Sequence, residues 1–373
     1  MPQADSDRRK LDMTQKTHTL ARSQAGALSP GRATLATLAL AIGLTASQAA
    51  HAQASSVTLY GLLDLSLDWS HSGSQSTYRM LSGAQTGSRF GLKGSEEIGG
   101  GNRINFTLEN GFNLNNGTAS DSTSIFNRQA WVGASGRWGE VRFGRQNSPL
   151  YVPLEGKFDA TGASTIASGL NSFATLSVRA SNAIYYGTPD IAGFSAQAML
   201  GLRDGTTTLR SGINNYHLTA SYTRGPVDLG VGFQSVDSAM NASTLKAFFG
   251  GGSYDFGTVR LFAGFHHAQQ SDGSVDKNVY TVSGAYRFNP ASSLALVYSH
   301  LDDRTPAARN ADHVGLMYAY WLSKQTWLYA SGAVLLNKGR ASYALAGSTT
   351  PGVAVAYSGA DAQGIQIGVQ HRF

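Results

Sequence analysis

The segment SVTLYGLLDLSLDW (Ser56–Trp69) alternates apolar and polar side chains along most of its length. Its large apolar residues fall mainly at odd positions, and Thr, Asp and Ser fall at even positions. A helix would mix the two sets, because its period is about 3.6 residues, whereas a strand places alternate residues on opposite faces. The segment therefore predicts a β-strand with one apolar and one polar face.

The same alternation recurs in NRINFTLENGF (Asn102–Phe112), VDLGVGF (Val227–Phe233) and HVGLMYAYWL (His313–Leu322). The alternation is clear in roughly two-thirds of these runs, and it is ambiguous around 127–133 and 327–336, where both faces carry large apolar groups. Runs of this kind between turn signals predict sixteen strands. They lie near 55–70, 78–96, 102–116, 124–137, 139–147, 179–188, 193–203, 214–225, 227–239, 244–257, 259–270, 278–289, 292–303, 311–323, 326–338 and 361–373.

Short and long connections alternate between these strands, as the links at 224–226 and 289–290 and the segments 204–213 and 339–360 illustrate. Beyond residue 52 no segment approaches 18 consecutive apolar residues, which excludes helical membrane spans. A sheet in lipid must close, because unpaired edge N–H and C=O groups are costly there. The fold class predicted is all-β: a 16-stranded antiparallel transmembrane β-barrel, wide enough for an aqueous lumen.

The N-terminus predicts export. Residues 1–32 are polar and basic, and a run of small and apolar residues follows at Ala33–Ala46. Such a run fits the apolar region of a signal peptide and is too short for a membrane-spanning helix. We expect cleavage between Ala52 and Gln53, which makes 1–52 a signal peptide and 53–373 a single barrel domain. A cut after Ala54 and a start at Met13 remain alternatives.

Composition narrows the class further. Of 29 Lys and Arg and 23 Asp and Glu residues, six and three lie in residues 1–52, so the remainder carries 23 basic and 20 acidic residues. This small excess gives no indication of a nucleic-acid partner. Cysteine is absent, which excludes a disulfide scaffold, thiol nucleophiles and Cys-ligated metals. We predict no cofactor and no metal.

Aromatic residues predict interfacial girdles near the strand ends. The residues assigned to these girdles are Trp69, Tyr151, Tyr222, Tyr286, Phe288, Tyr298, Trp321 and Trp327. The chain also ends within an alternating strand, GIQIGVQHRF, on Phe373. A soluble β-sandwich has no reason to end in this way.

Several segments together resemble the trimeric general porins of Gram-negative bacteria, in the branch common among β-proteobacteria. The segments that carry this resemblance over nearly the whole mature chain are SSVTLYGLLD (Ser55–Asp64), GSRFGLKGSEEIGGG (Gly87–Gly101), FTLENGF (Phe106–Phe112), FNRQAWVGASGRWGEVRFGRQNSPLY (Phe126–Tyr151), RASNAIYYGTPDIAGFSA (Arg179–Ala196) and Phe373. The resemblance implies a homotrimer in the outer membrane, in contact with lipid and lipopolysaccharide, that lets ions and small hydrophilic solutes diffuse through. It also implies that Ile367, Val369 and Phe373 form an outer-membrane assembly signal.

The stretch at 146–178 is too long for an ordinary hairpin loop. The resemblance makes it the third external loop, folded into the lumen, where Glu155 and Asp159 would supply carboxylates to the constriction. An outward surface loop is the alternative.

Basic residues are predicted to line the channel around this loop. The candidates are Arg89, Lys93, Arg103, Arg128, Arg142 and Arg179. Four are placed inward by alternation; Phe90 and Leu92, for example, take the outward face opposite Arg89 and Lys93. The resemblance places Arg128 and Arg179 at the constriction. Six basic against two acidic candidates predict a weakly anion-selective channel.

An enzyme is not expected, because the sequence lacks a G-x-S-x-G elbow and an H-E-x-x-H motif. Ser299 and His300 are adjacent and would point to opposite faces of one strand. A substrate-specific channel or a barrel adhesin is the alternative function. A sugar channel would carry an aromatic row along the lumen; Tyr60 is predicted to face inward, but the sequence shows no continuous inward aromatic row.

Overall fold

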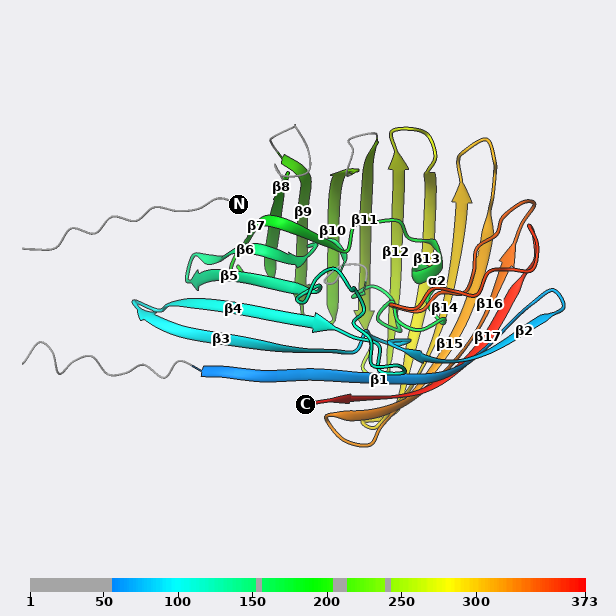
Figure 1. The fold of residues 1–373 in the computed structure, drawn as a ribbon, viewed down its shortest axis with the longest axis horizontal. Helices are drawn as coiled ribbons and strands as arrows, with labels where there is room; N and C mark the ends of the chain where they lie inside the picture. The colour runs from blue at the N-terminus through cyan, green and yellow to red at the C-terminus, as the bar shows by residue number, and fades with distance from the viewer. Residues whose placement is uncertain (1–55, 152–155, 204–212, 239–242) are drawn as a thin grey trace, which may run out of the picture. The chain divides into compact units, whose positions relative to one another are not determined.

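The computed structural model describes residues 56–151, 156–203, 213–238 and 243–373. They form an almost wholly β structure (Figure 1), with one short helix, α2 (Gly169–Phe173). The strands are β1 (Ser56–Ser72), β2 (Gln75–Ser82), β3 (Arg89–Gly99), β4 (Asn102–Gly111), β5 (Gln129–Gly136), β6 (Gly139–Asn147), β7 (Arg179–Gly187), β8 (Phe194–Leu202), β9 (Ile213–Arg224), β10 (Val227–Asp237), β11 (Thr244–Asp255), β12 (Val259–Gln270), β13 (Asp276–Asn289), β14 (Ser292–Asp303), β15 (Ala311–Trp321), β16 (Thr326–Asn337) and β17 (Ala362–Arg372).

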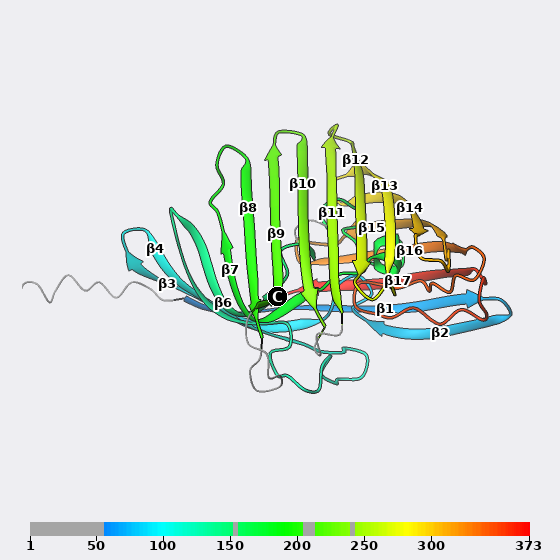
Figure 2. The ribbon, with the colours of Figure 1, turned by 90° about the horizontal axis from the view of Figure 1, so that it is seen from above.

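All pairings between consecutive strands are antiparallel, and β17 pairs with β1 to close the sheet. The two strands lie side by side in both ribbon views (Figures 1 and 2). Strands β2 and β3 occupy one position, because β2 pairs with one half of β1 and β3 with the other half. The barrel therefore has sixteen strand positions, which confirms the predicted fold class.

The break between β2 and β3 has a structural role. The sequence predicts one strand over 78–96, but residues 83–88 leave the sheet, and Gly83 takes a positive φ of 78° that favours glycine. The buried Ala84 offers its carbonyl oxygen to the N–H groups of Thr165 and Ser348, at 3.0 and 3.2 Å. The segment thus attaches the wall to two distant loops.

Thirteen of the other predicted strands begin and end within two residues of the observed ones. The predictions at 102–116 and 124–137 are too long, because β4 ends at Gly111 and β5 begins at Gln129. The intervening chain turns back on itself: the Gly117 N–H donates to the Asn113 carbonyl at 2.8 Å, and the Gly111 N–H donates to the Asn127 side chain at 2.9 Å. These local bonds compete with continued pairing.

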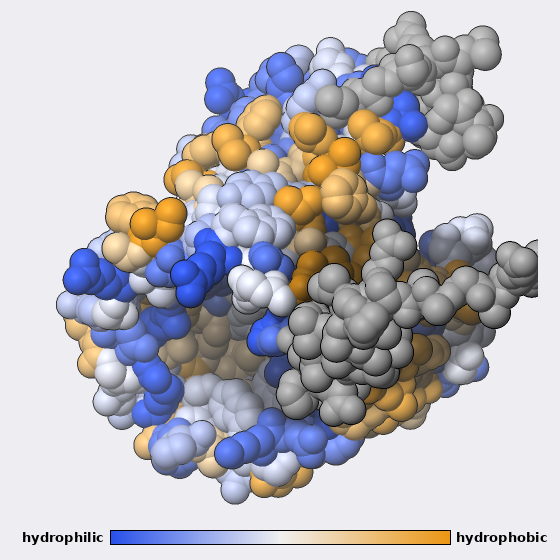
Figure 3. Space-filling view, turned by 90° about the vertical axis from the view of Figure 1, so that its left-hand side faces the viewer, coloured by the Kyte–Doolittle hydropathy of each residue, from blue (hydrophilic) through white to orange (hydrophobic). Residues whose placement is uncertain are grey.

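The wall has an apolar outer face and a polar inner face, as the alternation predicts. Val57 is 64% exposed on the outside, while Asp64, Ser66 and Asp68 of the same strand are buried inside. On the side drawn in Figure 3, hydrophilic residues form much of the rim of a hollow. No helix among the described residues is long and apolar enough to span a bilayer.

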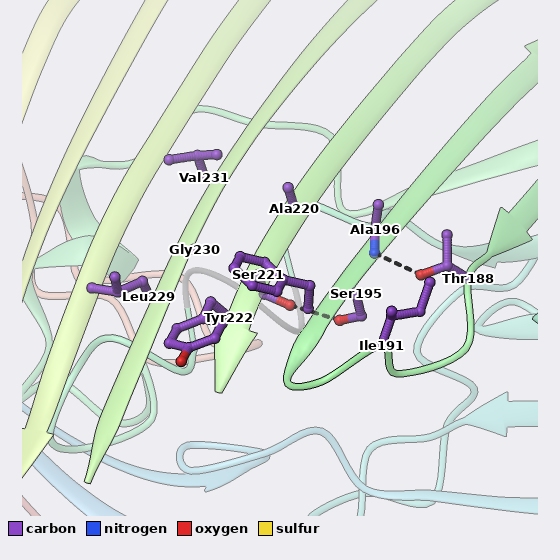
Figure 4. Close-up of a pocket in the computed structure, with 11 residues that line it drawn as sticks. Thr188, Ile191, Ser195, Ala196, Ala220, Ser221, Tyr222, Leu229, Gly230 and Val231 are labelled. Carbon is purple, nitrogen blue, oxygen red and sulfur yellow. Dashed lines mark hydrogen bonds between the residues drawn. The ribbon is translucent and has the colours of Figure 1, made fainter. Parts of the chain in front are cut away.

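A groove of about 420 Å³ lies on the outer side of the wall, across β8, β9 and β10. Figure 4 shows Tyr222 and Leu229 beside the small residues Ala220 and Gly230 that form its floor. Its lining is almost entirely apolar, and Ile191 and Phe194 at its edge are more than 60% exposed. This groove faces away from the lumen and offers a polar solute little to bind.

The main hydrophobic cluster lies inside the barrel. It joins Phe158, Ile166 and Phe173 of the 148–178 segment to inward residues such as Phe249 and Leu335. Helix α2 lies against β13, β14 and β15. This hydrophobic cluster therefore fills one part of the lumen and holds the segment there.

Candidate functional site

The described residues between β6 and β7, 148–151 and 156–178, are folded into the lumen, which confirms the predicted inward third loop. Backbone hydrogen bonds attach it to inward side chains around the wall. The Ala160 N–H donates to Ser283 Oγ at 3.0 Å, and the Thr175 N–H donates to His266 Nε2 at 3.2 Å. At Ile166 the N–H donates to Gln366 Oε1 at 3.1 Å.

Glycines let the loop approach the wall closely. A Cβ at Gly315 of β15 would lie 2.0 Å from the Ala167 carbonyl oxygen, and one at Gly251 of β11 would lie 2.8 Å from the Phe158 ring. Beside Gly315, His313 Nε2 lies 2.9 Å from the Ile166 carbonyl oxygen. The loop backbone therefore occupies space that any other residue at position 315 would fill.

A cavity of about 340 Å³ remains between the loop and the opposite wall. Three of the predicted basic residues line it together: Arg89 at the start of β3, Arg128 just before β5, and Arg179 at the start of β7. The loop contributes Gly156, Gly162 and Ala163, and residues 348 and 349 of the β16–β17 connection complete the lining. This cavity is the candidate constriction.

Glu109 of β4 is the carboxylate of this cavity and is only 3% exposed. It accepts a hydrogen bond from Arg128 Nε at 2.8 Å, and Arg89 Nε lies 3.5 Å from its second oxygen. The Tyr60 hydroxyl donates to it at 3.0 Å. Among the described lining residues, three guanidinium groups thus face one carboxylate, a formal excess of two positive charges.

The other three predicted basic residues lie outside this cavity. Arg142 pairs with Glu140 at 2.6 Å, and its guanidinium lies 4.4 and 4.9 Å from the rings of Trp131 and Tyr185. Lys93 stands over the Tyr60 ring at 5.3 Å. Alternation identified the inward face for these residues but not their position along the barrel axis.

Arg103 also lies outside the cavity, because it pairs with Glu97 beside the turn that joins β3 to β4. This pair is about half exposed and lies at the end of the barrel where the short links are.

Two loop carboxylates, Glu155 and Asp159, are predicted from the sequence to lie at the constriction. Asp159 does not face the arginines: it is 2% exposed and accepts hydrogen bonds from the Thr161 N–H and hydroxyl and from the Ser168 hydroxyl, at 2.6–2.8 Å. Burial raises the pKa of its carboxyl above the usual value. Hydroxyl groups of the loop itself therefore bind this side chain, and it lies away from the arginines. Glu155 lies outside the described residues, as do Ala52, Gln53 and the signal-peptide prediction.

The terminal strand lies as alternation predicts. Ile367 and Val369 face outward, and Phe373 ends the chain beside β1. The role of these three residues in assembly stays a prediction.

Three aromatic assignments were wrong. Trp321 and Trp327 face the lumen instead of the lipid interface: their neighbours Tyr320, Leu322 and Leu328 take the outward face. Together with Tyr329 they form an inward aromatic row, which sequence alternation missed because both faces of this stretch are apolar. The third is Tyr151, which lines the arginine cavity. Glu109 and Tyr60 were placed inward by alternation but were not recognised as site residues.

Within the described ranges, no group of three or more His, Cys, Asp or Glu side chains is placed to hold a metal ion. The site consists of fixed charges in a hollow open to diffusion. A closed barrel with an apolar belt and a charged, loop-narrowed lumen defines a transmembrane diffusion channel.

The comparisons identify the particular family. The sequence pattern of the Gram-negative porin family matches residues 36–340. An outer membrane porin protein of Bordetella pertussis is 30% identical over 366 residues, covering 80% of this chain and 94% of that protein. Outer membrane porin protein 32 of Delftia acidovorans is 30% identical over 360 residues, covering 90% and 99%. The chain belongs to the Gram-negative porin family.

Solved structures agree. An anion-selective porin from Comamonas acidovorans superimposes with a TM-score of 0.75 at 26% identity, covering 86% of this chain and 100% of that one. OmpT of Vibrio cholerae, in a trimer form, shares the fold with a TM-score of 0.67 at 16% identity, with the same coverage. The protein is an outer-membrane porin that forms a channel for passive diffusion, and its relatives are channels.

Proposed function

We propose that this porin is weakly anion-selective and that Arg89, Arg128 and Arg179 set the preference. The observation that carries the proposal is the charge of the cavity lining, three guanidinium groups against the one carboxylate of Glu109. A net positive throat with low-dielectric walls raises the local concentration of anions. The 26% identical structure described as an anion-selective porin supports the same reading.

Pairing explains why the preference is weak. Glu109 contacts two of the three arginines directly, so part of their field is neutralised at short range. Physiological salt screens charges across about 8 Å, which reduces the effect on an ion that crosses a water-filled throat. Arg179 forms no ion pair with Glu109 among the contacts of the described residues, so we assign it the largest share of the uncompensated charge.

The test is the reversal potential of single channels in a KCl gradient. Wild type should favour chloride, and the triple variant Arg89→Gln, Arg128→Gln, Arg179→Gln should shift the potential toward cation preference. Arg103→Gln is the matched control, because it removes one Arg that lies outside the cavity and is paired with Glu97. A cation-favouring wild type, or an equal shift in the control, would overturn the assignment.

The assembly proposed is a homotrimer in contact with outer-membrane lipid and lipopolysaccharide, without catalytic activity. The support is the sequence resemblance, the family membership and the trimer form of a protein with the same fold. Chemical cross-linking of the mature protein in detergent should give a limiting species of three chains, and conductance should appear in steps that are multiples of three. A limiting species of one chain would contradict the trimer and leave the channel proposal in place.

A further inference from the structure

A second polar hollow lies inside the barrel at the opposite end from the long loops. Trp321 and Trp327, at the facing ends of β15 and β16, stack with their ring centroids 5.5 Å apart and their planes within 7°. Trp327 is nearly buried, and its Nε1–H donates to Gln370 Oε1 at 2.9 Å. Trp321 remains 39% exposed. The buried ring thus holds the exposed ring in a fixed orientation over the hollow.

The hollow beside Trp321 has a volume of about 460 Å³. Polar groups from four neighbouring strands, β11 to β14, line it, among them Asp255, Arg260, Arg287, Asn289 and Ser293. Arg287 donates to both oxygens of Asp255, at 2.6 and 2.7 Å, which fixes the guanidinium and the carboxylate relative to each other. Donors and acceptors are therefore preorganised opposite an aromatic ring.

The charge of this hollow differs from that of the arginine cavity. Arg287 is paired with Asp255, and Arg260 is paired with Asp228, which lies outside the lining and also binds Lys157, so each guanidinium has a carboxylate partner. Guanidinium groups that are each paired with a carboxylate attract anions less than unpaired ones do. The remaining capacity of the hollow is for a neutral solute that both donates and accepts several hydrogen bonds.

The aromatic ring restricts the solute further. The face of an indole ring carries the negative part of its quadrupole and attracts polarised C–H groups. A pyranose ring presents such C–H groups on one side and hydroxyls at its edge. The combination of an exposed ring held by a second ring, paired charged groups, an amide and hydroxyls fits this pattern.

We propose that this hollow, which we name the Trp321 subsite, binds neutral saccharides through stacking on Trp321 and hydrogen bonds to Asp255, Arg287 and Asn289. The subsite lies in the mouth at the short-link end, apart from the arginine cavity, and shares no lining residue with it. A sugar there would obstruct the channel transiently. The inference assumes an open channel but does not depend on its ion selectivity.

The experiment measures blocking of single channels by maltotriose added to each side of a planar bilayer in turn. Wild type should show transient block, with faster onset from the short-link side. Trp321→Ala should weaken apparent binding about tenfold. Trp138→Ala is the matched control, because Trp138 is an exposed tryptophan in the β5–β6 link, at the same end, outside the subsite; its block should match wild type.

A second variant guards against a folding defect. Ala285→Trp would fill the hollow from β13 while leaving Trp321 in place, and should abolish block. Basal conductance without sugar checks that each variant forms a channel. Absence of block in wild type, or undiminished block in Ala285→Trp, would overturn the subsite. The KCl reversal potential of the same channels tests ion selectivity separately.

Discussion

Glu109 shows at the scale of a single residue how one buried carboxylate sets the charge of the constriction. It binds Arg128, approaches Arg89 and accepts the Tyr60 hydroxyl. Glu109→Gln should strengthen chloride preference in the reversal potential, because the lining would then carry three positive charges and no negative one. It should also destabilise the barrel by about 3 kcal/mol, since breaking a buried ion pair leaves charges unpaired.

Urea unfolding of the mature protein in lipid checks the second effect. Glu140→Gln is the control, since Glu140 pairs with Arg142 outside the cavity and is more exposed. A Glu109→Gln channel with unchanged or weaker chloride preference would contradict the role of Glu109.

Asp159 gives a prediction about pH. Because burial raises the pKa of its carboxyl, the folded protein holds this proton more tightly than the unfolded chain does. The stabilising contribution is thus present at acid pH and lost as the pH rises through the folded-state pKa. Asp159→Asn should therefore be more stable than wild type at about pH 8 and lose that advantage at about pH 4.

Unfolding midpoints of the mature protein at the two pH values provide the measurement. Asp121→Asn is the control: hydrogen bonds from Thr123 lower the pKa of this exposed carboxyl, so its loss should act in the opposite direction. A gain for Asp159→Asn that is equal at both pH values would show that the carboxyl's titration is not responsible.

The candidate site could be predicted only in part. Arg89 and Arg179 begin strands that follow inward segments, and together with Arg128 they meet in one cavity. Arg103 lies next to the start of β4, at the opposite end of the barrel. Alternation predicts which face of the sheet a side chain takes. The position of that side chain along the barrel axis depends on strand tilt and stagger, which the sequence of a single strand does not encode. The carboxylate of Asp159 lies away from the arginines because it accepts hydrogen bonds from the nearby hydroxyls of Thr161 and Ser168.

At the scale of an element, the loop inside the lumen depends on Gly315. A Cβ there would overlap the Ala167 carbonyl oxygen, so Gly315→Ala must move the loop backbone. We expect altered single-channel conductance and faster protease cleavage within 156–178. Gly332→Ala on β16 is the matched control, because a Cβ there meets only the Gly364 carbonyl oxygen at 3.8 Å. Wild-type conductance in Gly315→Ala would contradict the close packing of the loop backbone against Gly315.

Strands were the most predictable elements, because period-2 patterning is local and repeats in each of them. Failures occurred where tertiary contacts overrode the pattern. Residues 83–88 leave the sheet to bind Thr165 and Ser348, which are far away in the sequence. The inward tryptophans of β15 and β16 were missed because these strands carry apolar side chains on both faces. Their inward face is apolar because the folded loop packs against it inside the lumen.

At the scale of the whole molecule, closure brings the two ends of the described barrel together. The N–H of Gly61 donates to the Phe373 carbonyl at 2.9 Å, and the Phe373 N–H donates to the Gly61 carbonyl at 3.1 Å. The Phe373 ring lies over Gly61, where an added Cβ would be 2.2 Å from the ring. The last residue therefore has a structural role in the closing pair, and a role as an assembly signal must be separated from it.

Two variants separate these roles. Deleting Phe373 removes both the contact and the terminal aromatic, whereas Gly61→Ala disturbs the contact and leaves the terminus intact. If Ile367, Val369 and Phe373 are read as a signal, the deletion should reduce the heat-modifiable barrel in the outer membrane several-fold more than Gly61→Ala does. Refolding of the two purified variants in detergent, where no assembly machinery acts, should give similar yields. Equal losses in cells would assign Phe373 to barrel closure alone, because a recognised terminus must matter beyond the contact that it makes.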